Sequence, residues 1–198
     1  DQIRGCSALL KQRLAKEAKA TAFYNRGNAF IAKNDFGRAI SDYSDAIGLK
    51  PAYAQALFNR AVAHRISGNA PAAISDFTAV LALTPGDADA FAGRGAAHAS
   101  IGKHQESLSD LNRAIEIKPD HLTALTQRGH AYVRAHQWAS AIADYSAAIA
   151  ISTASVEAIY GRANVDFHAK RYEQALAQYD QVLALKPDHA HAHQRRGR

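Results

Sequence analysis

The side chains of this sequence that could do chemistry are ten histidines, one cysteine and a set of evenly spaced arginines. Nucleophilic and acid–base catalysis need partner groups at defined positions, and a zinc site needs His, Cys or acidic ligands at short, regular spacings. No Ser, Cys or carboxylate accompanies the histidines at a repeated spacing, and no nucleophile elbow, phosphate-binding loop or HExxH helix is present. We therefore predict no enzyme activity, no cofactor and no metal site.

Two local features suggest other chemistry. His189 and His193 are four residues apart and could share one helix face, but no carboxylate or thiol completes a set of metal ligands. The segment Ile3-Arg4-Gly5-Cys6 is similar to a lipid-attachment signal, but arginine does not fit there and no apolar leader precedes it. We interpret the histidines as an incidental part of a repeat and Cys6 as a small buried hydrophobic residue.

The arginines share one spacing of 34 residues, at Arg26, Arg60, Arg94, Arg128, Arg162 and Arg196. An aspartate follows 16 residues after four of them, at Asp42, Asp76, Asp110 and Asp144. The arginines could form a cationic stripe that binds anions, but charges that recur together are more simply explained as partners. We predict that each of these arginines pairs with its aspartate across two packed helices.

Proline shares the 34-residue period, and three residue types in one period indicate a solenoid of repeats. In each repeat apolar residues follow the helical period twice, as Phe23, Gly27 and Phe30 do, and breakers such as Lys33-Asn34-Asp35 separate the two stretches. We predict five helix pairs, preceded by a capping helix over 1–19 and followed by the start of a truncated sixth repeat over 190–198. The five repeats span 20–53, 54–87, 88–121, 122–155 and 156–189.

These repeats resemble the tetratricopeptide repeat family, whose helix–turn–helix unit carries a large residue, a glycine, an aromatic, an alanine, a second aromatic and a closing proline. The resemblance covers residues 20–189, and its departures are local, such as Ala61 and Ala163 in place of the glycine. It implies an all-α fold, a right-handed superhelical solenoid of antiparallel helix pairs.

Composition and charge exclude several function classes. The chain has 198 residues, 47% of them hydrophobic, and a net charge of +6 that is confined to the segments 1–19 and 190–198. A nucleic-acid binder needs a continuous basic face, and a membrane span needs about 18 consecutive apolar residues, so we predict neither. The lack of methionine suggests a processed chain or an excised piece. The compartment stays open between the cytoplasm and export to a bacterial periplasm.

The resemblance also implies that the first helix of each repeat lines an inner groove. Aromatic residues stand at both ends of this predicted groove, and small residues in its middle leave room for a bulky guest. Side-chain amides both donate and accept, which suits a peptide backbone, although these polar residues could merely face solvent. The predicted peptide-binding residues are Tyr24, Asn25, Asn28, Phe58, Asn59, Val62, Arg65, Gln127, His130, Arg134, Tyr160, Asn164 and Phe167.

Some repeats of this family, in chaperone cofactors, hold a C-terminal carboxylate with Lys, Asn, Asn, Lys and Arg. The matching positions here are Tyr24, Asn28, Asn59, Asp89 and Gly93. Both asparagines are present, but every cation is missing and one position is acidic. We predict that the chain does not use this clamp.

The function predicted from these observations is a protein–protein interaction scaffold. It would hold a peptide or a helical segment of a partner of unknown identity in its groove, with aromatic anchors for affinity and amides for register. Two alternatives stay open. The chain could self-associate through the ends of the array, or it could be the substrate-recruiting region of a larger enzyme.

Overall fold

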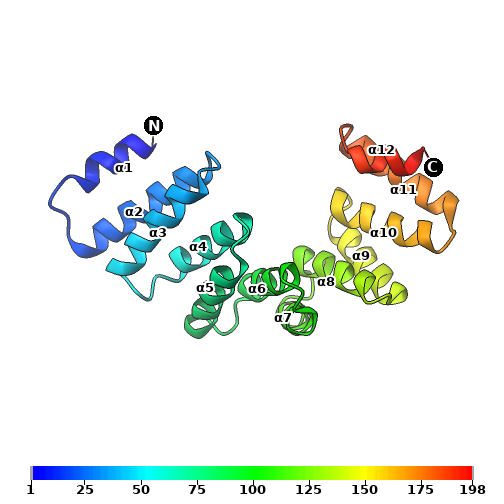
Figure 1. Ribbon diagram of the computed structural model, residues 1–198, viewed down its shortest axis with the longest axis horizontal. Coiled ribbons are helices and arrows are strands. Elements are labelled where there is room, and N and C mark those ends of the chain that lie inside the picture. The colour runs from blue at the N-terminus through cyan, green and yellow to red at the C-terminus, as the bar shows by residue number, and fades with distance from the viewer. Residues whose placement is uncertain (1, 198) are drawn as a thin grey trace. The chain divides into compact units, whose positions relative to one another are not determined.

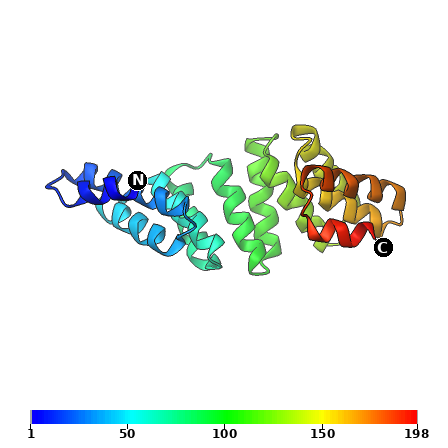
Figure 2. The ribbon, with the colours of Figure 1, turned by 90° about the horizontal axis from the view of Figure 1, so that it is seen from above.

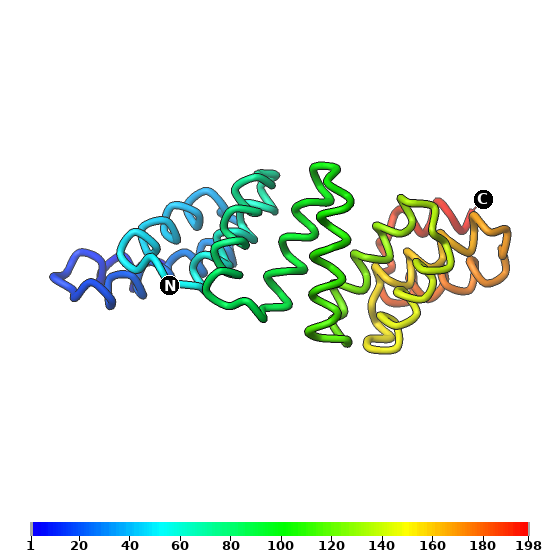
Figure 3. Tube along the Cα trace, turned by 90° about the horizontal axis from the view of Figure 1, so that it is seen from below, coloured from blue at the N-terminus to red at the C-terminus, as the bar shows by residue number. Residues whose placement is uncertain are grey.

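A computed structural model describes residues 2–197, which form twelve helices and no strand (Figure 1). The chain divides into two compact units, the first ending at Lys103 and the second beginning at His104. In each unit consecutive helices reverse direction, as the trace in Figure 3 shows. The limits that we assign to the individual repeats stay a prediction.

The first unit contains six helices, and each packs against the next. The alternate helices α2 and α4, and α4 and α6, also touch. Its core forms around two rings that α3 and α5 contribute, those of Tyr43 and Phe77, which are almost fully buried. The helices are α1 (Gln2–Leu10), α2 (Lys16–Ile31), α3 (Phe36–Leu49), α4 (Ala54–Ile66), α5 (Ala70–Leu83) and α6 (Ala88–Ser100).

The second unit repeats this arrangement (Figure 2). Consecutive helices pack pairwise, α8 also touches α10, and the buried rings are those of Tyr145 and Tyr179. Each ring belongs to a second helix and fills the space beside a first helix. The helices are α7 (His104–Ile117), α8 (Leu122–Arg134), α9 (Trp138–Ile151), α10 (Val156–His168), α11 (Tyr172–Leu185) and α12 (Ala190–Arg196).

Local signals explain where the helices begin and end. Asp35, Asn69 and Asp87 each precede a helix and accept a hydrogen bond from the backbone N–H three residues later, at 3.1, 3.3 and 2.9 Å. A residue with positive φ follows the C-terminus of successive first helices. These residues recur every 34 positions, at Asn34, Gly68, Gly102, His136 and Lys170.

Three arginines bind the aspartates that their spacing predicts, in the pairs Arg26–Asp42, Arg60–Asp76 and Arg128–Asp144. The pair Arg94–Asp110 stays a prediction. In Arg128 the Nε and Nη2 atoms donate to the two carboxylate oxygens of Asp144 at 2.7 Å each. The third arm, Nη1, donates to Asn112 on the preceding helix α7 at 2.8 Å. One arginine thus connects the three helices α7, α8 and α9. The pairs Arg26–Asp42 and Arg60–Asp76 have the same bidentate geometry.

In the fifth repeat, a glutamine and a second carboxylate take the place of the aspartate that pairs with the arginine. Gln178 occupies the aspartate position and accepts a hydrogen bond from Arg162 at 3.2 Å. The Gln178 amide donates to the buried carboxylate of Asp166 at 2.7 Å, and Arg171 donates to the same carboxylate. These four arginines, Arg26, Arg60, Arg128 and Arg162, are therefore structural parts of the helix stack, and an anion-binding stripe is not needed to explain them.

Candidate functional site

All thirteen predicted peptide-binding residues lie on the helices α2, α4, α8 and α10, and none of them is buried. Because α2 touches α4 and α8 touches α10, the residues form one surface in each unit. We define the first-unit surface as Tyr24, Asn28, Phe58, Asn59 and Val62. We define the second-unit surface as Gln127, His130, Tyr160, Asn164 and Phe167.

Two asparagines organise the first-unit surface. The Asn59 amide nitrogen donates to Asn28 Oδ1 at 2.9 Å and to the Tyr24 hydroxyl at 3.3 Å. The Tyr43 hydroxyl also donates to Asn28 Oδ1, at 2.7 Å. Burial raises the pKa of Tyr43 to about 12, so this hydroxyl stays a neutral donor.

These bonds leave one donor group, the Asn28 amide nitrogen, and one acceptor atom, the Asn59 oxygen, for a ligand. Asn28 uses its oxygen twice and keeps its amide N–H groups, whereas Asn59 uses its amide nitrogen and keeps its oxygen. Within residues 2–197 neither remaining group forms a hydrogen bond. The pair therefore presents the complement of one peptide unit, which has one N–H and one C=O.

Two cavities adjoin this pair. The smaller, of about 140 Å³, lies beside Asn28, Ile31, Tyr43, Asn59 and Val62. The larger has a volume of about 320 Å³, within the usual range for ligand pockets. Asn59 lies on both cavities. The lining of the larger cavity is Tyr24, Ala54, Gln55, Phe58, Asn59, Val80, Thr84, Asp87 and Asp89.

The two aromatic residues of this surface, Tyr24 and Phe58, pack against other aromatic rings of the first unit. The Phe58 ring meets the buried Phe77 ring edge to face, with the centroids 5.5 Å apart. The centroid of the Tyr24 ring lies 5.0 Å from the centroid of the Tyr53 ring and 6.0 Å from that of the Tyr43 ring. Each ring is half-buried, so one part is fixed by packing and another part is open to a ligand.

The second-unit surface is more polar. Gln127 donates to Glu157 at 3.3 Å, and His130 Nδ1 lies 3.6 Å from the same carboxylate. Asn164 Oδ1 accepts a hydrogen bond from the Tyr179 hydroxyl at 2.9 Å, which repeats the bond between Asn28 and Tyr43. Asn164 therefore keeps its amide N–H groups and the second lone pair of its oxygen for a ligand.

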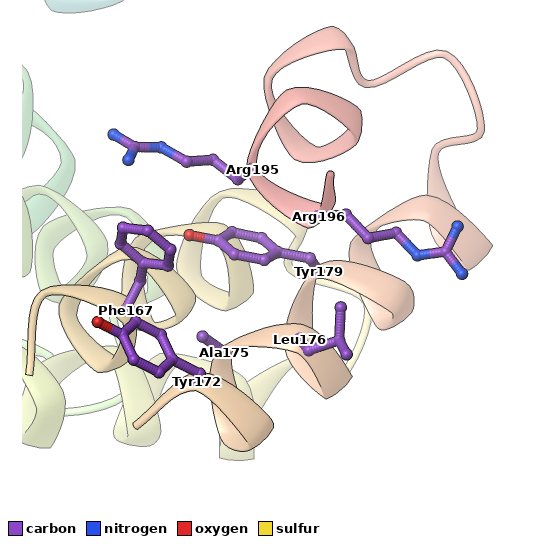
Figure 4. A pocket seen from close by; sticks show the side chains of 7 residues that line it. All are labelled: Phe167, Tyr172, Ala175, Leu176, Tyr179, Arg195 and Arg196. Carbon is purple, nitrogen blue, oxygen red and sulfur yellow. The ribbon is translucent and has the colours of Figure 1, made fainter. Parts of the chain in front are cut away.

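Phe167 lies at an open apolar cavity of about 310 Å³ on the second unit (Figure 4). The Tyr172 ring meets the Phe167 ring edge to face at 5.5 Å, and the Arg195 guanidinium lies 5.3 Å from the Phe167 centroid. Leu176 completes the apolar wall and is exposed, as is Tyr172. In Figure 4 the Arg196 side chain points away from Phe167, and it pairs with Asp180.

Burial lowers the pKa of His130 below the ordinary value of 6.5, Glu157 acts in the opposite direction, and Arg134 reinforces the effect of burial. The folded chain thus binds this proton less readily than the unfolded chain does. We expect the free energy of unfolding to fall as the pH drops below about 6.5, and His130→Gln to reduce that pH dependence. Urea titrations between pH 7.5 and 5 measure it. The exposed His104, changed to Gln, is the control, and an equal effect of both variants would contradict this assignment.

The structure corrects one expectation about the small residues. An ideal Cβ atom on Gly93 would lie 2.4 Å from Cζ of Phe77, and one on Gly161 would lie 2.5 Å from Cζ of Tyr145. The space beside these glycines is therefore filled by buried rings of the preceding second helix. Gly93 belongs to the middle repeat, so the expectation that small residues there leave room for a guest is wrong at this position.

Of the predicted residues, six line a cavity described above: Tyr24, Asn28, Phe58, Asn59, Val62 and Phe167. The other seven line none of these cavities: Asn25, Arg65, Gln127, His130, Arg134, Tyr160 and Asn164. Conversely, Thr84 and Asp87 line the larger first-unit cavity and were not predicted. Asp87 carries a periodic signal, because 34-residue steps connect it to Tyr53, His121, Ser155 and His189, which also precede first helices. A fourth cavity, on the second unit, is lined by Trp138, Ala139, Ile142, His168, Ala169 and Arg171.

His189, His193 and Cys6, the residues considered for metal binding and lipid attachment, have structural contacts or are buried. No group of three or more His, Cys, Asp or Glu side chains among residues 2–197 could hold a metal ion. His189 instead caps α12, accepting the Ala192 N–H at 3.1 Å, and His193 Nε2 bonds the Pro187 carbonyl oxygen. Cys6 is buried, as expected. None of the helices between residues 2 and 197 has the length and the apolar character that a membrane span requires.

Family models described as tetratricopeptide repeat match residues 24–88, 66–121 and 132–197. The chain belongs to the tetratricopeptide repeat family. As a tetratricopeptide repeat protein it is an all-α solenoid of helix pairs, a fold typical of protein–protein interaction scaffolds. The fold and the family predicted from the sequence are confirmed.

Solved structures of other tetratricopeptide proteins have the same fold. TTC0263 of Thermus thermophilus is 21% identical with a TM-score of 0.76, over 90% of this chain and 97% of its own. pilF of Pseudomonas aeruginosa is 15% identical with a TM-score of 0.79, over 89% and 81%. YrrB, described as a TPR protein with an unusual peptide-binding site, is 20% identical with a TM-score of 0.68, over 99% and 100%. No curated protein sequence matches this chain.

Proposed function

We propose that this tetratricopeptide repeat protein binds an extended segment of a partner protein on its first-unit surface. The observation that carries the proposal is the Asn28–Asn59 pair, which presents one amide donor and one carbonyl acceptor beside two cavities. A bound peptide unit would satisfy both groups, and its flanking side chains would enter the cavities.

Affinity would come from the half-buried aromatic residues. Tyr24 and Phe58 offer large apolar surfaces that are already held by neighbouring rings. Little conformational freedom is then lost on binding, and aromatic anchors of this kind carry most of the energy in many interfaces. The second-unit surface also has two half-buried aromatic residues, Tyr160 and Phe167. Its amides bond to Glu157 and Tyr179, so we confine the proposal to the first-unit surface.

The test begins with a phage library of 12-residue peptides selected on the intact chain. We expect Phe58→Ala and Asn59→Ala each to weaken a selected, fluorescein-labelled peptide by at least about tenfold, in the range of interface hot spots. Fluorescence anisotropy gives the Kd, and circular dichroism checks that each variant stays folded.

The matched control is Tyr172→Ala, which removes an exposed aromatic residue of the second unit. It should leave the Kd unchanged. Suppose that the Kd of a peptide is unchanged in Phe58→Ala and Asn59→Ala, while Tyr172→Ala abolishes binding. Binding would then lie at the Phe167 cavity, which would contradict the proposal. Failure to select any peptide would also contradict it.

A further inference from the structure

The larger first-unit cavity has an uneven distribution of charge. Two carboxylates, Asp87 and Asp89, line it, and no lysine or arginine does. The rings of Tyr24 and Phe58 and the amide of Asn59 form other parts of its lining. The cavity is therefore acidic and aromatic at the same time.

The geometry of the start of α6 holds the acidic side in place. Asp87 precedes the helix, and its Oδ1 atom accepts the backbone N–H of Ala90 at 2.9 Å. Asp89 lies in the first helical turn and is exposed. Capping needs only a side-chain oxygen, which asparagine or serine would supply equally well. The negative charge of Asp87 is thus not required for the cap and is available to a ligand.

We propose that this cavity receives a lysine or arginine side chain of the bound segment, so that the first unit selects cationic peptides. The proposal rests on the proposed function and adds the chemistry of the partner to it. A cation is attracted both to carboxylates and to the faces of aromatic rings, and the cavity offers both kinds of group. The aliphatic part of the side chain would lie along Phe58 while its charged end meets the aspartates.

The same charges exclude the opposite ligand. A peptide carboxylate in this cavity would lie beside two like charges, those of Asp87 and Asp89. This agrees with the absence of the lysines and arginine of the carboxylate clamp at the matching positions, Tyr24, Asp89 and Gly93. Acidic peptides should therefore be rejected.

The experiment uses the 12-residue peptides selected on the intact chain that also lose binding to the Phe58→Ala variant. We expect lysine or arginine to be enriched at one position of these peptides. Replacing that residue by norleucine, which keeps length but removes charge, should weaken binding at least about fivefold, and replacing it by glutamate should weaken it further.

On the protein side, Asp87→Asn keeps the cap of α6 and removes its charge, and Asp89→Asn does the same in the first turn. The double variant should bind the lysine and norleucine peptides with similar Kd values, and its binding should depend less on salt. Asp45→Asn, an exposed carboxylate on α3 outside the cavity, is the matched control and should retain the discrimination.

The outcomes separate the two proposals. Peptides that need Phe58 but show no preference for lysine or arginine would overturn the cation inference and leave the proposed function standing. So would an unchanged lysine-to-norleucine ratio in the Asp87→Asn/Asp89→Asn variant. If no selected peptide depends on Phe58, the proposed function fails, and the cation inference fails with it.

Discussion

Arg128→Ala is expected to destabilise the second unit by about 3–5 kcal/mol, the cost of leaving one partner of a buried ion pair without the other. Asp144 is buried, and Arg128 supplies two of its hydrogen bonds at 2.7 Å. Without the guanidinium, the carboxylate would stay in a poorly hydrated environment. Chemical denaturation monitored by circular dichroism measures the loss.

The control for this prediction is Arg113→Ala. Arg113 pairs with Glu116 at 2.9 Å, but both side chains are exposed, so its removal should cost less than about 1 kcal/mol. Replacing Arg128 and Asp144 together by leucine should restore much of the lost stability, because no unpaired charge then remains. If Arg128→Ala were as mild as Arg113→Ala, the structural role of the arginines would be wrong.

Gly161→Ala is the second change with a large expected effect, a loss of about 1–3 kcal/mol or more from overpacking. The added methyl group would lie 2.5 Å from Cζ and 2.7 Å from Cε1 of Tyr145. The Tyr145 ring is only 1% exposed, and a Cβ atom built on Gly129 would lie 2.6 Å from Cε1 of the same ring. The ring therefore has little room to move away.

A double variant tests that cause. Tyr145→Leu removes ring atoms near Gly161, so the methyl group of Gly161→Ala should cost less in the Tyr145→Leu background than in the natural chain. Gly37→Ala is the control, because beyond its chain neighbours and the adjacent backbone of α3 no atom lies within 4 Å of a Cβ built there. Thermal and urea unfolding compare the variants, and strictly additive losses would show that the contact between Gly161 and Tyr145 is not responsible.

The sequence predicted the helix pairs and those contacts that recur at fixed positions within each repeat. The 34-residue period predicted helix pairs, and the 16-residue step from Arg26 to Asp42 predicted a contact across one pair, because residues at equal phase face each other in every repeat. A further step of 15 residues, from Asn28 to Tyr43 and from Asn164 to Tyr179, carries a hydrogen bond that was not anticipated.

Features that depend on the neighbouring repeat could not be predicted in this way. Whether a glycine such as Gly161 leaves open space or receives a ring is decided by the position of Tyr145 on the preceding helix. Likewise, Asp87 reaches the larger first-unit cavity because the start of α6 lies beside α4, a three-dimensional relation that spacing alone does not give. The candidate residues lie on the first helices of the repeats, as predicted, and their role in binding stays a prediction.

The most direct test of the proposed function maps a selected 12-residue peptide onto the chain by amide chemical-shift changes in NMR spectra. Binding at the first-unit surface predicts the largest changes in α2 near Tyr24 and Asn28, in α4 near Phe58 and Asn59, and at the start of α6. Changes confined to α3 and α5, or to the residues around Phe167, would contradict it.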